Sequence, residues 1–256
     1  MKLSINLNKI ALLRNARGEG HPSLEDFANK AIDLGVSGLT LHPRPDHRHA
    51  TSDDVISLSQ LCKNRDVEFN IEGNPFSMPL APFKGFVNLV KECQPDQITL
   101  VPDSPDQITS DHGWSPGGHD NKLKDIISEL KTTSPKSRVS LFVDSIKNGD
   151  ANLDAVDYAV LMGGDSIEIH TGYFAQCIAK EDFAISSLIK SIIVKANQSG
   201  ILVNAGHDLN LLNLPELVRI GGVDEVSIGH AVIVDALNYG FENTIKKYID
   251  ITKGKS

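Results

Sequence analysis

The chain has 256 residues, 40% of them hydrophobic and 23% charged, so it can bury a large core without disulfides or a structural metal. Its net charge of −8 at pH 7 argues against a general nucleic-acid-binding protein, because such a protein needs a basic face that neutralises phosphates. No stretch approaches the roughly 18 consecutive apolar residues of a membrane span, so a membrane protein is not expected.

The cysteines and the N-terminus favour a reducing compartment. The three cysteines, Cys62, Cys93 and Cys177, are odd in number and form no CxxC pair, so neither a disulfide framework nor a zinc site is expected. Near the N-terminus, Asn6 and Asn8 interrupt any apolar core of a signal peptide. We therefore expect a cytoplasmic protein.

Eight short segments have the composition and the partial alternation of buried strands. In chain order they are Leu3–Leu7, Gly38–Leu41, Glu68–Ile71, Gln97–Val101, Val139–Val143, Ser166–Ile169, Ile201–Asn204 and Glu225–Ile228. Helix-like stretches follow them. Ser23 and Thr51, each followed by acidic residues, predict two helix N-termini, and Gly35 predicts the end of the first of these helices.

Alternating strands and helices predict a parallel sheet, which can be an open doubly wound sheet or a closed barrel. The number eight, and polar residues at the C-terminal end of nearly every strand, favour a (β/α)8 TIM barrel. No linker-like tract divides the chain, so residues 1–256 are expected to form one domain. The longest loop, Asp103–Asn121, is expected to be a functional or mobile segment, although it can also be a tolerated insertion.

Polar side chains gather on one face of several predicted strands, since residues two apart in a barrel strand face the same side. The residues that share a face are Asn6 with Asn8, Thr40 with His42, Asn70 with Glu72, Glu168 with His170, and Leu202 with Asn204. A buried polar group without a partner costs about 1–3 kcal/mol, so such residues are costly as core filling. Their repetition at strand ends predicts a ligand site at the barrel mouth.

Two segments concentrate cationic side chains in this acidic protein. The run from His42 to His49 contains Arg44, whose guanidinium can bind phosphate with two hydrogen bonds. A solvated basic loop and a metal site are the alternatives, but only His42 lies at a strand end and no HExxH pattern is present, so no metal is expected. Arg14 and Arg17, after the first strand, form a second cationic pair.

Glycine-histidine pairs close the last two strands. Gly206-His207 and Gly229-His230 can let backbone N–H groups approach an anion, and a helix that begins there would favour its charge. Phosphate often binds after the seventh and eighth strands of such barrels. Together with nearby histidines and glutamates, this arrangement predicts proton-transfer chemistry on small phosphorylated molecules.

The motifs together resemble the pyridoxine 5′-phosphate synthase family of vitamin B6 biosynthesis. The matching segments, in family order, are residues 6–18 (Asn-Leu-Asn-Lys-Ile-Ala-Leu-Leu-Arg-Asn-Ala-Arg-Gly), 41–49 (Leu-His-Pro-Arg-Pro-Asp-His-Arg-His), 70–72 (Asn-Ile-Glu), 167–172 (Ile-Glu-Ile-His-Thr-Gly), 203–207 (Val-Asn-Ala-Gly-His) and 228–231 (Ile-Gly-His-Ala). They cover six of the eight predicted strands, and only their combination is specific.

The resemblance implies a TIM-barrel enzyme that joins 1-deoxy-D-xylulose 5-phosphate to 3-amino-2-oxopropyl phosphate and releases pyridoxine 5′-phosphate, phosphate and water. It also implies no organic cofactor, no required metal and a homo-octamer. By motif, the resemblance makes His42 and Glu72 general bases, His207 a general acid, and Glu168 the group that stabilises developing positive charge.

The resemblance also implies two substrate sites. Asn6, Arg17, Gly229 and His230 match the amino-ketone phosphate site, to which the backbone of Asp208 can add a contact. The deoxyxylulose phosphate site is matched by a second set, namely Asn8, Lys9, Arg44, His49 and Thr109. Many members have Asp-His in place of Asn8-Lys9, and often Gly in place of Asp208.

Two other functional classes are open. A cofactor-free phosphosugar isomerase or aldolase would share the phosphate sites but would need one phosphorylated substrate. Two cationic sets, Arg14/Arg17 and Arg44/His49, favour two such substrates. A barrel that only senses phosphate ligands would be expected to lose an acid or a base, but His42, Glu72, Glu168 and His207 are all present.

Overall fold

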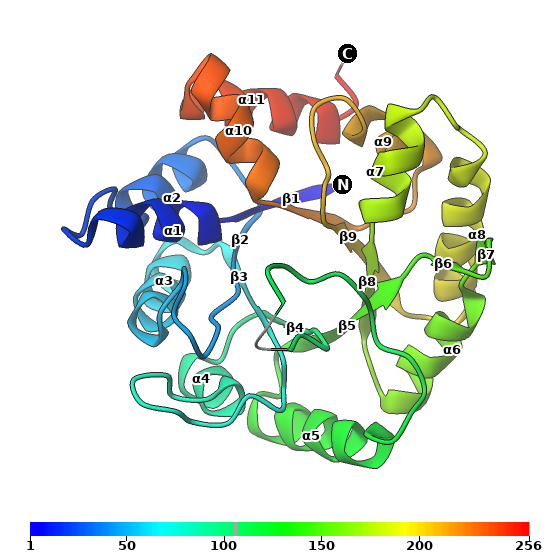
Figure 1. The fold of residues 1–256 in the computed structure, drawn as a ribbon, viewed down its shortest axis with the longest axis horizontal. Coiled ribbons are helices and arrows are strands. Elements are labelled where there is room, and N and C mark those ends of the chain that lie inside the picture. The colour runs from blue at the N-terminus through cyan, green and yellow to red at the C-terminus, as the bar shows by residue number, and fades with distance from the viewer. Residues whose placement is uncertain (105–106, 256) are drawn as a thin grey trace.

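Eight parallel strands close into a barrel, and the helices surround it as an outer ring (Figure 1). The computed structural model describes residues 1–104 and 107–255. Around the barrel the strands are β1 (Lys2–Asn6), β2 (Gly38–Leu41), β3 (Glu68–Gly73), β4 (Gln97–Leu100), β5 (Arg138–Asp144), β8 (Ser166–His170), β9 (Leu202–Gly206) and β10 (Glu225–Ile228), which pairs with β1 again. All eight predicted strands, and the TIM-barrel fold, are confirmed.

The helices that cover the barrel are α1 (Asn8–Arg17), α2 (Leu24–Asp33), α3 (Ser52–Arg65), α4 (Phe86–Cys93), α5 (Asp120–Thr133), α6 (Leu153–Met162), α7 (Gly172–Ala179), α8 (Ile185–Gln198), α9 (Leu214–Ile220), α10 (His230–Tyr239) and α11 (Phe241–Thr252). The predicted N-caps are confirmed: Ser23 accepts a hydrogen bond from the backbone of Asp26, and Thr51 forms a capping box with Asp54. Gly35, at φ 93°, follows the end of α2 as predicted. None of these described helices is long and apolar enough to cross a membrane.

Apolar side chains of the strands pack outward, and polar ones fill the lumen. Ile71 and Ile169 are fully buried in the hydrophobic core, and they alternate with Asn70, Glu72 and Glu168. Hydrogen bonds between strands that are not neighbours must cross the lumen. One joins the Asn204 amide on β9 to Gln97 Oε1 on β4, at 2.9 Å. The barrel therefore has a polar interior, in contrast to the branched apolar residues that usually fill such barrels.

Two details differ from the predicted elements. Strand β1 ends at Asn6, so Asn8 does not share its face; Asn8 is the first residue of α1. A two-stranded antiparallel hairpin, β6 (Ile146–Lys147) and β7 (Asp150–Ala151), lies outside the barrel after β5 and was not expected from the sequence. Its turn contains Asn148 and Gly149, both at positive φ, as hairpin turns of this kind require.

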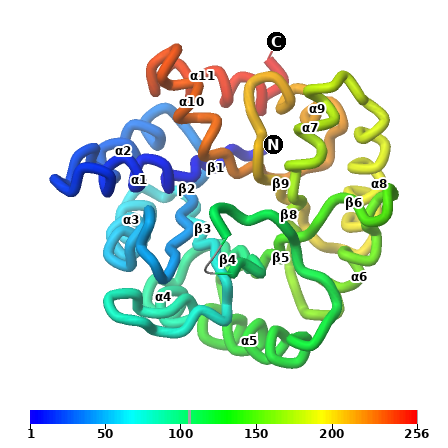
Figure 2. Tube along the Cα trace, in the orientation of Figure 1, coloured from blue at the N-terminus to red at the C-terminus, as the bar shows by residue number. Residues whose placement is uncertain are grey.

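The segment between β4 and α5 crosses the middle of the ring in the view of Figure 2. Hydrogen bonds tie it to both sides of the mouth. Arg44, after β2, donates to the Gln107 carbonyl at 2.7 Å, and Thr109 lies 3.1 Å from the Nε2 of His207, which follows β9. The long predicted loop therefore covers the C-terminal end of the barrel.

Candidate active site

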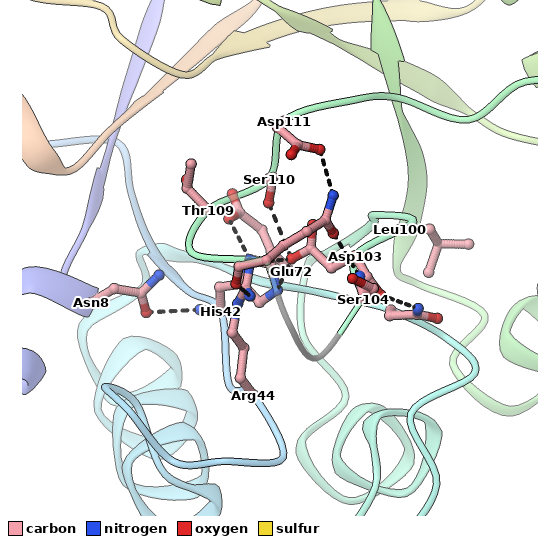
Figure 3. Close-up of polar contacts among 12 residues, drawn as sticks. Asn8, His42, Arg44, Glu72, Leu100, Asp103, Ser104, Thr109, Ser110 and Asp111 are labelled. Atoms are coloured by element: carbon pink, nitrogen blue, oxygen red, sulfur yellow. Dashed lines mark hydrogen bonds and ion pairs between the residues drawn. The ribbon is translucent and has the colours of Figure 1, made fainter.

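His42 lies between two carboxylates at the barrel mouth (Figure 3). Its Nε2 is 3.1 Å from Asp103 Oδ2, and its Nδ1 is 3.8 Å from Glu72 Oε2. The backbone N–H of His42 donates to Asn8 Oδ1 at 3.0 Å, which fixes the chain where β2 ends. All three ionisable side chains are buried. The arrangement places a proton-exchanging ring next to two groups that can receive or return a proton.

Glu72 and Glu168 are two buried carboxyls inside the lumen. Burial, with the nearby charges of Glu168 and Asp103, raises the pKa of Glu72 well above its ordinary value. Burial, with the charge of Glu225, raises the pKa of Glu168 to about 7. Thr99 donates to Glu168 at 3.4 Å. Because its pKa is close to neutral, Glu168 can exist in both protonation states during a reaction near pH 7.

Cations gather beside His42. Burial lowers the pKa of His49 to about 3, and the positive charges of nearby Arg44 and Lys9 act in the same direction. His49 is therefore neutral, and the expectation that it adds a cation is wrong. Its Nδ1 accepts the backbone N–H of Ala50 at 3.0 Å, so its Nε2 carries the proton and can donate a hydrogen bond. The group can bind an anion through two cations and a neutral donor.

Asn6 and Gly229 meet where β1 and β10 end. The amide of Asn6 donates to Glu72 Oε2 at 3.4 Å, and its Oδ1 accepts the backbone N–H of Asn8 at 3.0 Å. A Cβ on Gly229 would lie 3.0 Å from the Cβ of Asn6, which is tighter than an ordinary contact, so glycine favours this close approach. His230 begins α10, which places a helix N-terminus at this end of the barrel.

His207 follows β9 on a strained backbone. Its φ of 84° and the φ of 56° at Asp208 both lie in the left-handed region, which costs of order 1–3 kcal/mol for a residue other than glycine. The hydroxyl of Thr171 donates to the Gly206 carbonyl at 2.7 Å and also to the His207 carbonyl, and so holds the turn. No helix begins at this turn, since α9 starts only at Leu214; the expected helix N-terminus after the seventh strand is therefore wrong.

The ring of His207 has three polar or aromatic neighbours. Its Nδ1 is 3.1 Å from Asp208 Oδ2, and its Nε2 is 3.1 Å from the Thr109 hydroxyl. The contact with His207 holds the pKa of Asp208 below its usual range. The ring of His170 packs edge to face against it at 4.8 Å, and His170 Nδ1 is 3.5 Å from Asp144 Oδ1. A cavity of about 430 Å³ beside β5, β8 and β9 is lined by His207, Asp208, His170 and Asp144, among others.

The second predicted cationic pair does not join these groups. Arg14 binds both carboxylate oxygens of Asp54 and contacts Asn15, so it anchors α1 to the start of α3. Arg17 is exposed at the end of α1 and pairs with Glu19 at 3.2 Å. The structure thus places two groups of candidate anion-binding residues at the mouth, and neither includes the Arg14/Arg17 pair of this chain.

Asp103 is the site residue that our sequence reasoning missed. It follows β4 by three residues, is buried, and contacts His42, Arg44 and Ser110 through a single oxygen. The rule used for the other strands, a polar residue just beyond the C-terminal end, could have found it. Ser227 was missed as well; its hydroxyl lies 3.5 Å from Glu72 Oε1. Within the described residues, no group of three or more His, Cys, Asp and Glu is arranged to hold a metal ion.

Comparisons with known proteins identify the family of this chain. The family model of the pyridoxal phosphate biosynthesis protein PdxJ matches residues 3–254. Proteins named pyridoxine 5′-phosphate synthase from Xanthomonas oryzae pv. oryzae (strain MAFF 311018) and Xylella fastidiosa (strain 9a5c) are each 44% identical to this chain. The alignments cover 99% of the chain and 97% of the first protein, and 98% of the chain and 94% of the second.

Solved structures with low sequence identity share the barrel. A tryptophan synthase alpha-subunit from Pyrococcus furiosus has a TM-score of 0.63 at 14% identity, over 99% of this chain and 98% of that one. A thiamine phosphate pyrophosphorylase from the same organism has a TM-score of 0.58 at 16% identity, over 99% and 96%. These likenesses show the fold alone. The family match and the 44% identity also show the family: the chain belongs to the PdxJ family of pyridoxal phosphate biosynthesis enzymes.

Proposed function

We propose that this enzyme condenses 3-amino-2-oxopropyl phosphate with 1-deoxy-D-xylulose 5-phosphate to give pyridoxine 5′-phosphate, phosphate and water. The observation that carries the proposal is the buried His42–Glu72 pair, 3.8 Å apart, beside His49, on which the charges of Lys9 and Arg44 act. Proton-transfer groups and anion-binding groups therefore lie within one barrel mouth. The names of the 44% identical relatives support the same product.

The chemistry needs positioning and protons more than it needs a nucleophile. The amine of one substrate can attack the ketone of the other, so no lysine has to form a Schiff base. Holding two phosphorylated molecules together raises their effective concentration, and the remaining steps remove water and phosphate with successive proton transfers. His42 and Glu72 would serve as bases, and His207 as the acid that protonates the leaving oxygen.

Glu168 has the properties of a charge stabiliser. A carboxyl with a pKa of about 7 can lose its proton when positive charge develops beside it, and the buried site strengthens that interaction. Thr99 and Gly206 hold it in place, since the first donates to one oxygen and the second leaves room for the other.

The two substrates would bind to separate sets of residues near these catalytic groups. Lys9, Arg44, His49 and Thr109, together with Asn8, would bind the deoxyxylulose phosphate. The amino-ketone phosphate would bind in the second region, at the ends of β1, β9 and β10. Its residues there are Asn6, Gly229, His230 and the turn at Asp208. Arg17 belongs to this proposed site by family resemblance only. The family resemblance also supports a cytoplasmic homo-octamer without an organic cofactor or a required metal.

The proposal is tested by omitting substrates one at a time. Purified protein is incubated with both phosphates, or with either alone, and the product is identified by mass spectrometry. The proposal predicts pyridoxine 5′-phosphate only when both are present. Conversion of one phosphorylated sugar alone would instead support the isomerase or aldolase alternative. Light scattering during gel filtration tests the octamer separately.

A further inference from the structure

Asp103 makes an unequal use of its two carboxylate oxygens (Figure 3). Oδ2 lies 3.1 Å from His42 Nε2, accepts a hydrogen bond from Ser110 at 3.2 Å, and pairs with Arg44. Oδ1 is buried and has no donor among the described residues. The side chain therefore faces the His42 ring and the Arg44 guanidinium through one oxygen.

The protonation state of Asp103 follows from the same contacts. Burial alone would raise its pKa, but the contact with His42 and the charge of Arg44 outweigh burial, so the pKa of Asp103 lies below the ordinary value. An ionised carboxylate can only accept hydrogen bonds. A ring nitrogen 3.1 Å from such an oxygen must carry a proton, because two lone pairs at that distance would repel each other.

The protonation of the other ring nitrogen, Nδ1, then follows. When Nε2 holds the proton of a neutral imidazole, the lone pair is on Nδ1. Nδ1 faces Glu72 Oε2 at 3.8 Å, a gap that is longer than a direct hydrogen bond.

We propose that Asp103 is a positioning residue that fixes His42 with Nε2 protonated, so that Nδ1 is the nitrogen that takes the substrate proton beside Glu72. Asp103 does not itself need to exchange a proton during the reaction. Its contacts with Ser110 and Arg44 also connect this tautomer to the segment that covers the mouth, because Arg44 donates to the Gln107 carbonyl. The tautomer of His42 does not depend on the proposed function. Only the step in which Nδ1 takes a proton from the substrate rests on it.

The tautomer can be measured without substrate. Protein labelled with ¹⁵N in the histidine rings is studied by solid-state NMR in alkaline buffer, where an ordinary histidine is neutral. The chain has nine histidines, so the His42 signals are assigned by their loss in His42→Asn. We expect protonated Nε2 and unprotonated Nδ1 in the wild type, and a mixture of tautomers in Asp103→Asn. Ser110→Ala is the matched control, since it removes another contact to Oδ2 and should leave the tautomer unchanged.

Kinetics give the second measurement. Asp103→Asn should lower kcat about 10–100-fold, the usual cost of losing a carboxylate that orients a functional histidine. Asp103→Glu should recover part of the loss, whereas a purely structural role would change the melting temperature and leave kcat per folded molecule unchanged. A wild-type His42 with its proton on Nδ1, or an Asp103→Asn variant with wild-type kcat, would overturn the inference. Absence of turnover in the wild type would instead contradict the proposed reaction, while the NMR result would still decide the tautomer.

Discussion

The hydroxyl of Thr109 lies 3.1 Å from Nε2 of His207, and so connects two segments that are 98 residues apart in the chain. Thr109 belongs to the segment that crosses the barrel mouth, and His207 belongs to the strained turn after β9. The contact orients the ring of the proposed acid and holds the covering segment at the same time. A change at Thr109 should therefore alter catalysis through the position of His207.

Replacement of Thr109 by valine keeps the shape of the side chain and removes its hydroxyl. A neutral hydrogen bond contributes about 1 kcal/mol, so Thr109→Val should lower kcat/KM by roughly 5-fold. Thr109→Ser keeps the hydroxyl and serves as the control. Steady-state kinetics of both variants measure the effect; equal activity of Thr109→Val and wild type would show that the contact has no role in turnover.

Gly206 is expected to be intolerant of a side chain because Glu168 lies against it. A Cβ at this position would be 2.3 Å from Glu168 Oε1, so the carboxyl would have to move. Gly206→Ala should lower the free energy of unfolding by ~1–3 kcal/mol and should also lower kcat. The matched control is Gly118→Ala, where an added Cβ meets nothing within 4 Å. Thermal melts and kinetics that matched this control would contradict the proposed role of the Glu168 position.

Arg14 is expected to stabilise the fold without binding substrate. Its guanidinium is paired with both oxygens of Asp54, a residue that also caps α3. Because lysine cannot form such a two-bonded pair, Arg14→Lys should lower the free energy of unfolding by about 1 kcal/mol and leave both KM values unchanged. Arg44→Lys should instead raise the KM for the sugar phosphate. Chemical denaturation and kinetics separate the two effects, and a raised KM in Arg14→Lys would restore the idea of a second cationic binding pair.

Glu225 should make the fold less stable as the pH rises. It is buried in the lumen, and burial together with the charge of Glu68 raises its pKa from 4.5 to about 7. Between these two values the folded state holds a proton that the unfolded state has released, so the free energy of unfolding falls with rising pH. Glu225→Gln removes this loss. We expect the variant to be more stable than wild type by ~1–3 kcal/mol in alkaline buffer and similar to it below pH 4.5. Denaturation across this pH range measures it; a variant that is less stable at every pH would refute the explanation.

The fold could be predicted because its strands are short, apolar on one side and polar on the other. Ile167 and Ile169 pack outward while Glu168 points to the lumen, and this alternation is visible in the sequence. The residues at which strands end were predicted less accurately. Asn8 was placed on a strand because Asn6 and Asn8 alternate with apolar residues, but the chain turns into α1 at Leu7.

The parts of the site that escaped prediction depend on how loops fold back. Asp103 reaches the mouth only because its long segment crosses the barrel, and composition does not reveal that path. Thr109, on the same segment, was expected at the site from the family resemblance alone, and its contact with His207 was not. Arg14 has the same chemistry as Arg44, and both pair with a carboxylate. Only the folded structure shows that Arg14 pairs with Asp54 at the start of α3, whereas Arg44 pairs with Asp103 beside His42. The neutral state of His49 likewise results from burial among neighbouring cations.

The most direct test of the proposed reaction follows phosphate release and the absorbance of the pyridine ring in one reaction mixture. It uses both proposed substrates without added cofactor or metal, and compares wild type with His207→Ala. We predict that wild type releases phosphate and forms the ring together, and that the variant loses at least 100-fold of both rates, as expected for removal of a general acid. Folded wild-type protein that gives neither signal would contradict the proposed reaction, and phosphate release without ring formation would indicate an elimination that does not proceed to closure.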